Sequence, residues 1–437
     1  MVVQTYRFQR ISPFKFSINL TIFMNFVLTL FTILLLFKLM ADLGLDWLNL
    51  SEVNKNAHKV PEAFKHFVDS ETYSKSVDYS RTNMKFSMWS TIYDTALLAV
   101  IIFSGLLVFL WNYAQGILGT GIWGQAISLF AITIILSIPS FPFELYNTFK
   151  IEAKFGFNKS SLGLWITDKV KGIVLSAVIA IPLFALILWI VKLPLWWLWA
   201  TVVLAVFQVV MMVLYPVFIM PLFNKFTELE DGDLKDRLMS LADRTGFKAK
   251  SIYIMDGSKR SGHSNAFFSG LGKMRRIVLF DTLVEKHTEE ELEAILAHEI
   301  GHYKLGHIPK MLLVNILMTA IGFYILGLLV ESATFVEAFG FAYSPEVLTP
   351  TFILFTLFSG LITFWMSPFS NIFSRRHEYQ ADAFSKKAMQ GDARPLIEAL
   401  HKLHNSNLSN LTPHKLFSAF HYSHPTLMER ETALKSI

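Results

Sequence analysis

Two histidines one helical turn apart, with a carboxylate beside the first, are the residues of this chain best suited to chemistry. They form the motif His298-Glu299-Ile300-Gly301-His302. On a helix, imidazoles at positions i and i+4 share one face and can bind the same zinc ion. Glu299 is then placed to take a proton from a water molecule at that ion. The motif predicts a zinc hydrolase; the alternative is a chance match on a polar helix.

The surrounding sequence favours a helix at this position. Thr288 and Glu291 form a Thr-x-x-Glu capping box just ahead of an apolar run that starts at Leu292. We expect Pro309 to close the segment, which would give a helix of roughly four to five turns.

A zinc site needs a third protein ligand, and the helical stretch 375–382 offers one. Its acids Glu378 and Asp382 lie one turn apart. Glu378 could complete a His₂Glu site whose fourth position is open to water. Asp382 could accept the free ring N–H of a ligating histidine and so hold its tautomer. The alternative is that both acids pair with Arg375 or Lys386 on a solvated helix face.

His307 is a rival for the third ligand position. The longer zinc motif with three histidines requires glycine three residues after the second histidine, but Leu305 occupies that position. We therefore expect Glu378, and not His307, to complete the set.

The composition of the whole chain is that of a membrane protein. Of its 437 residues, 53% are hydrophobic and only 17% are charged. Few soluble proteins combine so much apolar surface with so few charges. Runs long enough to cross a bilayer predict seven spans, at residues 17–37, 95–111, 123–141, 172–191, 195–215, 311–330 and 350–369.

The first two spans each have a feature that affects how they are assigned. The first span is too long for a cleaved signal peptide and lacks its flanks, so we expect it in the mature protein. At the start of the second span, Asp94 marks either a helix end or a polar group that faces a cavity.

Positive charge predicts how the bundle sits in its membrane. Nearly all Lys and Arg lie in the segments 38–94, 142–171, 216–310 and 370–437, whereas the loops near 112–122 and 331–349 have none. The positive-inside rule places the C-terminus and both motif segments in the cytosol, and the N-terminus outside, although Arg7, Arg10 and Lys15 argue the other way. The absence of cysteine agrees with a reducing face for the working domain. Without a C-terminal dilysine signal, a bacterial inner membrane is favoured over the endoplasmic reticulum membrane of a eukaryote.

The spans divide the chain into four parts. Residues 1–221 form an N-terminal membrane half with five spans, and residues 309–370 hold two more. The soluble part is split into 222–308, which ends with the histidine motif, and 371–437, which carries Glu378. Within the first piece we expect a helix at 228–245 and short strands at Ser251–Met255, Asn265–Phe268 and Arg276–Phe280.

The net charge of +5 also raises the possibility of a nucleic-acid partner. The sequence has no basic stripe with interleaved aromatic residues. The excess of Lys and Arg instead lies in the loops that orient the spans in the membrane. We expect contact with membrane lipid and none with nucleic acid.

Several stretches spread over most of the chain together resemble the type I CAAX prenyl proteases, which are integral-membrane zinc enzymes. Besides the histidine motif, the resemblance rests on residues 60–61 and 75–79, 154–159, 260–266, 375–382, 421–425 and 429–430. It implies a predominantly α fold: seven membrane helices around a chamber, capped on the cytosolic side by a gluzincin-like protease domain with a small β-sheet. It also implies one Zn²⁺ per chain and a prenylated or membrane-associated peptide or protein as substrate.

The resemblance assigns roles to further residues. Asn265, with its neighbours Ala266 and Phe267, would lie on a strand whose free edge pairs with an extended substrate; the alternative for Asn265 is an ordinary turn residue. His424 would donate a hydrogen bond to the oxyanion of the reaction, a role for which His421 competes. Arg430 would support either Glu378 or the same oxyanion.

The predicted function is a membrane-embedded zinc metalloendopeptidase that removes a C-terminal tripeptide after a prenylated cysteine. One alternative keeps the chemistry but clears misfolded membrane proteins without a prenyl requirement. A second alternative is a transporter or receptor with a vestigial zinc site. Transporters place paired charges or broken helices near mid-membrane, whereas these spans are nearly free of charge.

Overall fold

The computed structural model describes residues 13–248, 251–269 and 276–437, with side chains from Phe26 onward. Within these residues, seven helical segments are long and apolar enough to cross a membrane. They run over Phe26–Asn56, Ser70–Phe103, Ile122–Glu152, Leu162–Ile190, Trp196–Leu222, His307–Val330 and Thr349–Ala388. The predicted count of seven spans is therefore confirmed.

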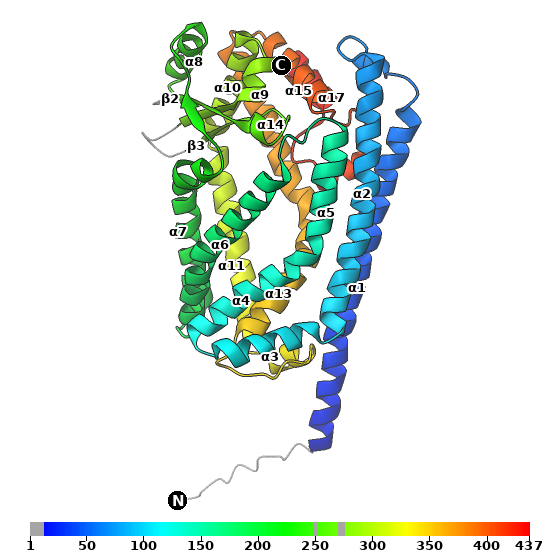
Figure 1. The fold of residues 1–437 in the computed structure, drawn as a ribbon, viewed down its shortest axis with the longest axis vertical. Helices are drawn as coiled ribbons and strands as arrows, with labels where there is room; N and C mark the ends of the chain where they lie inside the picture. Colours follow the sequence, from blue (N-terminus) through cyan, green and yellow to red (C-terminus); the bar gives the residue numbers. More distant parts are fainter. Residues whose placement is uncertain (1–12, 249–250, 270–275) are drawn as a thin grey trace, which may run out of the picture.

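The membrane bundle is built from long helices with short connections (Figure 1). The helices α1 and α2 stand side by side along one flank and extend toward the polar end of the molecule. The bounds of the helices in this part are α1 Pro13–Asn56, α2 Ser70–Phe103, α3 Leu106–Leu118, α4 Ile122–Ser137, α5 Phe141–Tyr146, α6 Leu162–Ile190, α7 Trp196–Leu214, α11 His307–Val330, α12 Ala333–Glu337 and α13 Thr349–Thr363.

The second span differs from its prediction at both ends. It was expected over 95–111, but α2 begins at Ser70 and stops at Phe103, and α3 starts separately at Leu106. Gly105 between them has a φ of 78°, a left-handed backbone that ends the helix and that glycine adopts readily. Asp94 is an exposed residue inside α2, and so does not mark a helix end.

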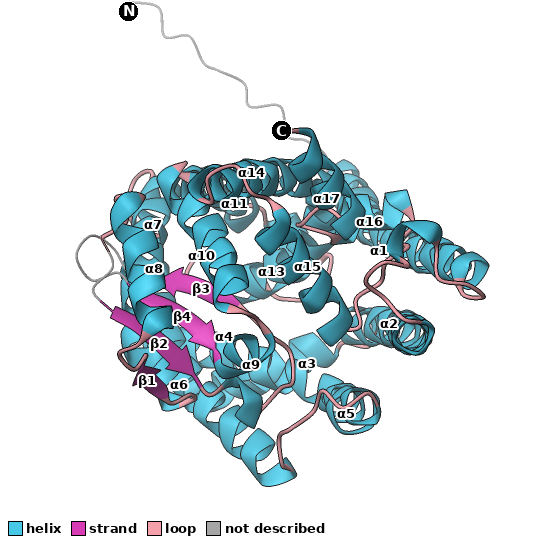
Figure 2. Ribbon diagram, turned by 90° about the horizontal axis from the view of Figure 1, so that it is seen from above, coloured by secondary structure: helices cyan, strands magenta, loops and turns pink. Residues whose placement is uncertain are grey.

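The protease part forms a cap at one end of the bundle. Its helices are α8 Asp233–Arg244, α9 Asp281–Lys286, α10 Glu289–Lys304, α14 Ser367–Ala388, α15 Arg394–Ser406, α16 Lys415–His421 and α17 Leu427–Ser436. A four-stranded sheet has the order β1-β2-β4-β3, with strands β1 Phe226–Glu228, β2 Ser251–Met255, β3 Ala266–Ser269 and β4 Arg276–Phe280. Seen from above, the sheet lies on one side of α10 and α15 lies on the other (Figure 2).

The observed sheet agrees with the three predicted strands, except that it has an additional first strand, β1. Strands β2 and β4 have the predicted bounds and pair in parallel, and β3 is displaced by one residue from the expected range. The strand β1 was missed, because the helix expected at 228–245 starts only at Asp233. The three residues of β1 pair antiparallel with β2, so a tertiary contact and not local preference makes them a strand.

The described part of the chain has several hydrophobic clusters, and one of them forms the core of the protease cap around α10. In the cap, Leu238 and Leu241 of α8 pack with Ile277 and Leu279 of β4 and with Leu296 of α10, all at most 1% exposed. This core fixes α10 against the sheet.

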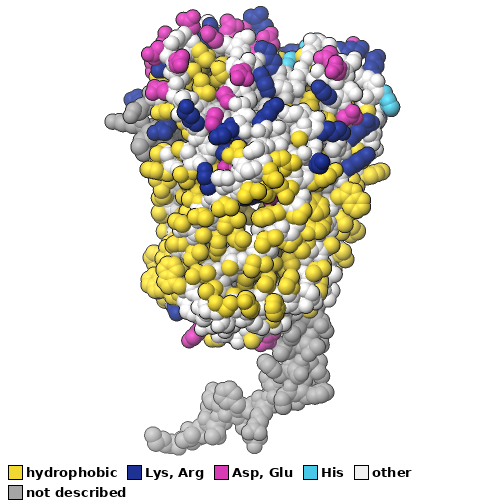
Figure 3. Space-filling view, viewed as in Figure 1, with side chains coloured by type: hydrophobic (Ala, Val, Ile, Leu, Met, Phe, Trp, Pro, Cys, Tyr) yellow, Lys and Arg dark blue, Asp and Glu magenta, His cyan; other side chains and the backbone are white. Residues whose placement is uncertain are grey.

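The surface shows where the bilayer lies. On the face shown in Figure 3, a broad hydrophobic band crosses the middle of the molecule, and most charged side chains gather at the end that carries the protease cap. Exposed apolar residues of the spans include Val170, Val174 and Val178 on α6 and Leu317, Ile321 and Leu328 on α11. Such a surface is stable only in lipid. The predicted fold class, predominantly α with a membrane bundle and a small sheet, is confirmed.

Candidate metal centre

The helix α10 presents both histidines of the motif, and its start follows from the sequence. The Thr288 hydroxyl accepts a hydrogen bond from the Glu291 backbone N–H, and the Glu291 carboxylate accepts one from the Thr288 N–H. This reciprocal capping box satisfies two backbone donors that a helix otherwise leaves free.

The end of α10 corrects the prediction that Pro309 closes it. The helix stops at Lys304, and Gly306 adopts a left-handed φ of 68° before α11 begins at His307. Pro309 lies in the first turn of α11, where its missing N–H has no intrahelical partner to lose. The 16 residues of the motif helix agree with the expected four to five turns, but the helix ends before Pro309 and leads directly into the sixth span.

The three predicted ligands come together on facing surfaces of α10 and α14. The Nε2 atoms of His298 and His302 lie 3.1 Å apart. Glu378 on α14 places one carboxylate oxygen 3.3 Å from His302 Nε2 and the other 3.5 Å from His298 Nε2. With metal–ligand bonds of about 2.0–2.2 Å, the edges of a tetrahedral site measure about 3.3–3.6 Å. The separations therefore suit one ion between the three atoms.

The surroundings of the three ligands also call for a cation. The Oε2 atom of Glu378 is buried and has no hydrogen-bond partner among the described residues. The carboxylates of Glu378 and Asp382 are both buried, and both lie beside the ring of His298 and the single guanidinium of Arg430. A buried carboxylate oxygen without a partner is costly, and a metal ion would satisfy it.

Asp382 and Arg430 hold the first histidine in place. The ring N–H at Nδ1 of His298 donates to Asp382 Oδ1 at 2.8 Å, which leaves Nε2 free to bind a metal. Arg430 donates to both oxygens of Asp382, at 2.6 and 2.9 Å, and its Nη1 lies 3.7 Å from Glu378 Oε2. Of its two predicted roles, this geometry favours support of the carboxylates over contact with the oxyanion. Neither Arg375 nor Lys386 forms an ion pair with Glu378 or Asp382 among the described residues.

Glu299 lines a cavity of about 380 Å³ beside these ligands. The cavity is also bordered by His298, Glu378 and Arg430. Burial raises the pKa of the Glu299 carboxyl above its ordinary value. Such a shift moves a carboxylate toward the basicity that a general base needs at neutral pH.

His424 and His421 are separated by the fold. His424 borders the cavity of Glu299, and its Nε2 lies 3.5 Å from Glu378 Oε1. His421 lies at the end of α16, contacts the ring of Phe417 at an angle of 33°, and does not border that cavity. Of the two competing histidines, only His424 reaches the ligand set.

The predicted substrate strand lies beside the same cavity. Asn265 and Ala266 border it, whereas Phe267 faces Phe280 on the neighbouring strand with ring centroids 6.4 Å apart. Asn265 is exposed and directly precedes β3, which is an edge strand of the sheet. Edge strands present unpaired backbone groups that can align an extended peptide.

Comparisons with known proteins agree over nearly the whole chain. A model for the CAAX prenyl protease N-terminal region, with five membrane helices, matches residues 49–225, and the model of peptidase family M48 matches residues 228–437. The chain belongs to peptidase family M48.

Relatives within this family have similar lengths. CAAX prenyl protease 1 of Saccharomyces cerevisiae is 41% identical over 402 residues, which cover 86% of this chain and 88% of the yeast protein. The Homo sapiens homologue of CAAX prenyl protease 1 is 33% identical over 431 residues, covering 88% and 90% of the two chains. A crystal structure of S. mikatae Ste24p has 37% identity and a TM-score of 0.86, and the match covers 92% of this chain and 97% of that one. This M48 peptidase is therefore a multi-pass membrane metalloendopeptidase.

Two residues of this M48 peptidase near the metal centre were not assigned a role from sequence. His307, rejected as a ligand, lies at the start of α11 with its Nδ1 3.0 Å from His302 Nδ1 and its Nε2 2.9 Å from Gln380 Oε1. It thus contacts the ring of the second ligand on the side opposite the metal position. In the sequence, the only sign of this contact was that His307 follows His302 by five residues.

His404 on α15 borders the cavity of Glu299 and a neighbouring cavity of about 580 Å³. Its buried Nδ1 has no hydrogen-bond partner among the described residues, and burial lowers the pKa of its ring to about 4. A neutral imidazole that borders this cavity can form a hydrogen bond with a peptide group of a substrate. Nothing in the local sequence of an amphipathic helix distinguishes this residue.

Proposed function

We propose that this M48 peptidase binds one catalytic Zn²⁺ through His298, His302 and Glu378 and cleaves prenylated proteins after the modified cysteine, releasing a C-terminal tripeptide. The observation that supports it most is the buried cluster of these three ligands where α10 turns into the sixth span. The names of the yeast and human relatives, both CAAX prenyl protease 1 or its homologue, support the substrate class.

In the proposed peptide hydrolysis, several side chains of this protein have separate roles. When bound, Zn²⁺ polarises the scissile carbonyl and makes water a stronger nucleophile. Glu299 accepts the proton of the attacking water and delivers it to the leaving amine. His424 donates a hydrogen bond to the oxygen that gains negative charge. Asp382 and Arg430 keep His298 in the ligating tautomer.

The substrate would approach from two environments at once. Its last residues extend along β3 past Asn265 and Ala266, which border the cavity of Glu299. Its prenyl chain stays among the membrane helices, because each buried CH₂ gains about 0.8 kcal/mol relative to water. Membrane lipid is the other partner, and it contacts the apolar surface of the membrane helices.

We propose that the protease cap faces the cytosol. The charge distribution supports this orientation, since Lys and Arg gather at the cap. The yeast and human relatives are eukaryotic, so we favour the endoplasmic reticulum membrane over the bacterial inner membrane preferred from the sequence.

The test uses one CAAX peptide in farnesylated and unmodified form at equal concentration. We expect the purified protein to cleave the farnesylated form at a single bond after the cysteine, with a much higher kcat/KM. Glu299→Gln, purified in parallel, excludes a contaminating protease. Equal kcat/KM for both forms, with cleavage at scattered bonds, would instead support quality control of membrane proteins.

A further inference from the structure

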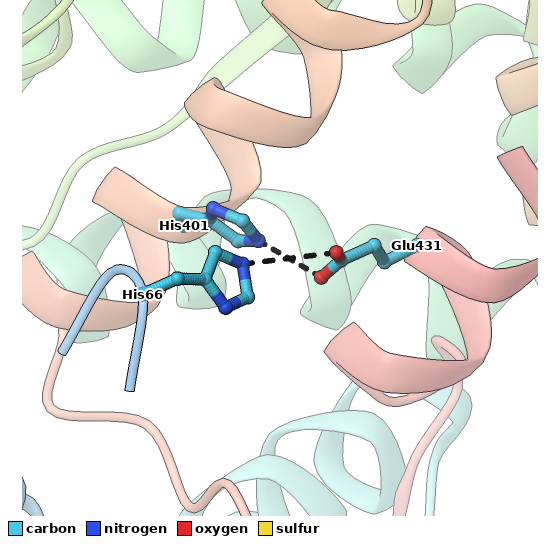
Figure 4. Close-up of side chains that lie close together, drawn as sticks. All are labelled: His66, His401 and Glu431. Carbon is cyan, nitrogen blue, oxygen red and sulfur yellow. Dashed lines mark hydrogen bonds and ion pairs between the residues drawn. The ribbon is translucent and has the colours of Figure 1, made fainter. Parts of the chain in front are cut away.

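A second group of metal-binding side chains lies outside the catalytic centre. His66, His401 and Glu431 come from distant parts of the chain, and their ligand atoms all lie within 4.8 Å of one another. The two imidazoles turn toward the two oxygens of the Glu431 carboxylate (Figure 4). His401 Nε2 lies 2.9 Å from Glu431 Oε2, and His66 Nε2 lies 3.8 Å from Glu431 Oε1.

These residues join the membrane half to the protease cap. His66 belongs to the connection between α1 and α2, whereas His401 and Glu431 belong to α15 and α17. The connection is held there by other contacts: the Asn405 side chain donates to the Phe67 carbonyl at 2.8 Å, and the Phe67 ring stacks on His401 with centroids 3.8 Å apart. His66 is thus presented to the carboxylate by a docked segment.

The group is separate from the catalytic centre. A cavity of about 580 Å³ borders His66, His401 and Glu431, and no residue that borders it also borders the cavity of Glu299. The space beside the three ligands can hold the water that completes a coordination sphere.

The geometry of the catalytic ligands provides a standard for comparison. Their facing ligand atoms are 3.1 to 3.5 Å apart, and those of the second group are 2.9 and 3.8 Å apart. The distance from His66 to Glu431 is too long for a hydrogen bond, and a small rotation of the half-exposed His66 ring would bring its nitrogen to the spacing of two ligands that share an ion. We propose that His66, His401 and Glu431 form a second, exchangeable binding site for a zinc-like divalent ion, which fastens the α1–α2 connection to the protease cap.

The Glu431 carboxylate already has two polar contacts that an ion would have to replace. His401 Nε2 donates to Glu431 Oε2 at 2.9 Å, and Lys435 donates to Glu431 Oε1 at 2.5 Å. An ion would replace the hydrogen bond between His401 and Glu431, with the ring proton moving to Nδ1. Lys435, 63% exposed, can swing into solvent.

The ligand types select the class of ion. Two imidazoles and one carboxylate suit Zn²⁺, Co²⁺ or Ni²⁺, whereas Mg²⁺ and Ca²⁺ prefer oxygen ligands. The 54% exposure of the His66 side chain leaves the site open to solvent, so its ion exchanges more readily than the catalytic one.

The experiment counts ions in the full-length protein after removal of metal with a chelator. The Glu378→Gln variant lacks a catalytic ligand, so specific binding in it reports the second site. Titration of this variant with Co²⁺, followed by visible absorption, should saturate at one ion per chain. Adding His66→Ala should weaken that binding at least about tenfold, since even partners of metal ligands contribute 10- to 100-fold.

His58→Ala is the matched control, because His58 is an exposed histidine of the same connection and lies outside the group. Its addition to Glu378→Gln should leave the titration unchanged. The proposal is overturned if Glu378→Gln takes up no Co²⁺, or if His66→Ala and His58→Ala give the same curve. Since His66 is largely exposed, its substitution leaves the fold intact.

Discussion

At the scale of residues, the metal centre distinguishes two glutamates that look alike in sequence. Glu378 places both carboxylate oxygens within 3.5 Å of the histidine nitrogens, whereas Glu299 borders the open cavity beside them. The same chemical change at the two positions should therefore have different consequences, because we propose that Glu378 binds the metal and that Glu299 moves a proton.

Glu299→Gln should retain the catalytic zinc and lose activity by at least about 10²–10⁴-fold, since general-base catalysis contributes about that much. Glu378→Gln should lose the zinc as well, because an amide is a poor ligand. Elemental analysis of both variants in a His66→Ala background counts the catalytic ion alone. Full zinc in Glu378→Gln, or none in Glu299→Gln, would contradict the ligand assignment.

His424→Ala should lower kcat about 10²–10³-fold with zinc content unchanged, because loss of one oxyanion donor has that effect. His421→Ala is the matched control, since this ring does not border the catalytic cavity. Steady-state kinetics on a farnesylated peptide give the result. A larger loss of kcat for His421→Ala than for His424→Ala would reverse the assignment.

At the scale of elements, the site depends on how closely α10 and α14 approach. Gly301 lies between His298 and His302 in the motif. A Cβ built on Gly301 would lie 3.1 Å from Ala381 Cα and 3.1 Å from Phe384 Cβ. Ser385 of α14 donates to the Ala294 carbonyl of α10 at 2.8 Å and so fixes the same interface. A side chain at Gly301 would push apart the helices that carry the ligands.

Gly301→Val should therefore weaken zinc binding at least about tenfold, because Glu378 would move away from the histidines. Gly172→Val is the control, since Gly172 lies inside a helix and has nothing within 4 Å of its built Cβ. Zinc affinity is measured by competition with a chelator on detergent-purified protein. Equal affinities in the two variants would show that the close approach does not control the site.

At the scale of the whole molecule, the polar cap and the opposite loops must lie on different sides of the membrane. The hydrophobic band separates them (Figure 3), and positive charge favours the cytosol for the cap. The absence of cysteine makes this orientation simple to measure, because an introduced thiol has no background.

Single cysteines at Ser436 in the cap and at Ala342 in the connection between α12 and α13 are both exposed in the structure. A membrane-impermeant thiol reagent should label Ser436→Cys in sealed microsomes whose cytosolic face is outward, and should label Ala342→Cys only after detergent is added. Total labelling in detergent corrects for different reactivities. The reverse pattern would overturn the proposed orientation.

The sequence alone predicted what depends on local chemistry and on composition. Apolar runs predicted seven spans because lipid demands about 20 apolar residues for each helix. The capping box and the i, i+4 histidines predicted the start of α10 and two ligands on one face, because both are properties of a single helix. Glu378 was predicted as the third ligand from its spacing of one helical turn to Asp382, although 75 residues separate it from His302 in the sequence.

Only the tertiary structure decided how these parts meet. The separation of His421 from His424 depends on the turn after α16, and the contact of His307 with His302 depends on the break at Gly306. The strand β1 and the group His66–His401–Glu431 require segments far apart in sequence to be adjacent. Such contacts arise from packing over the whole chain, so no local pattern of residue types carries them.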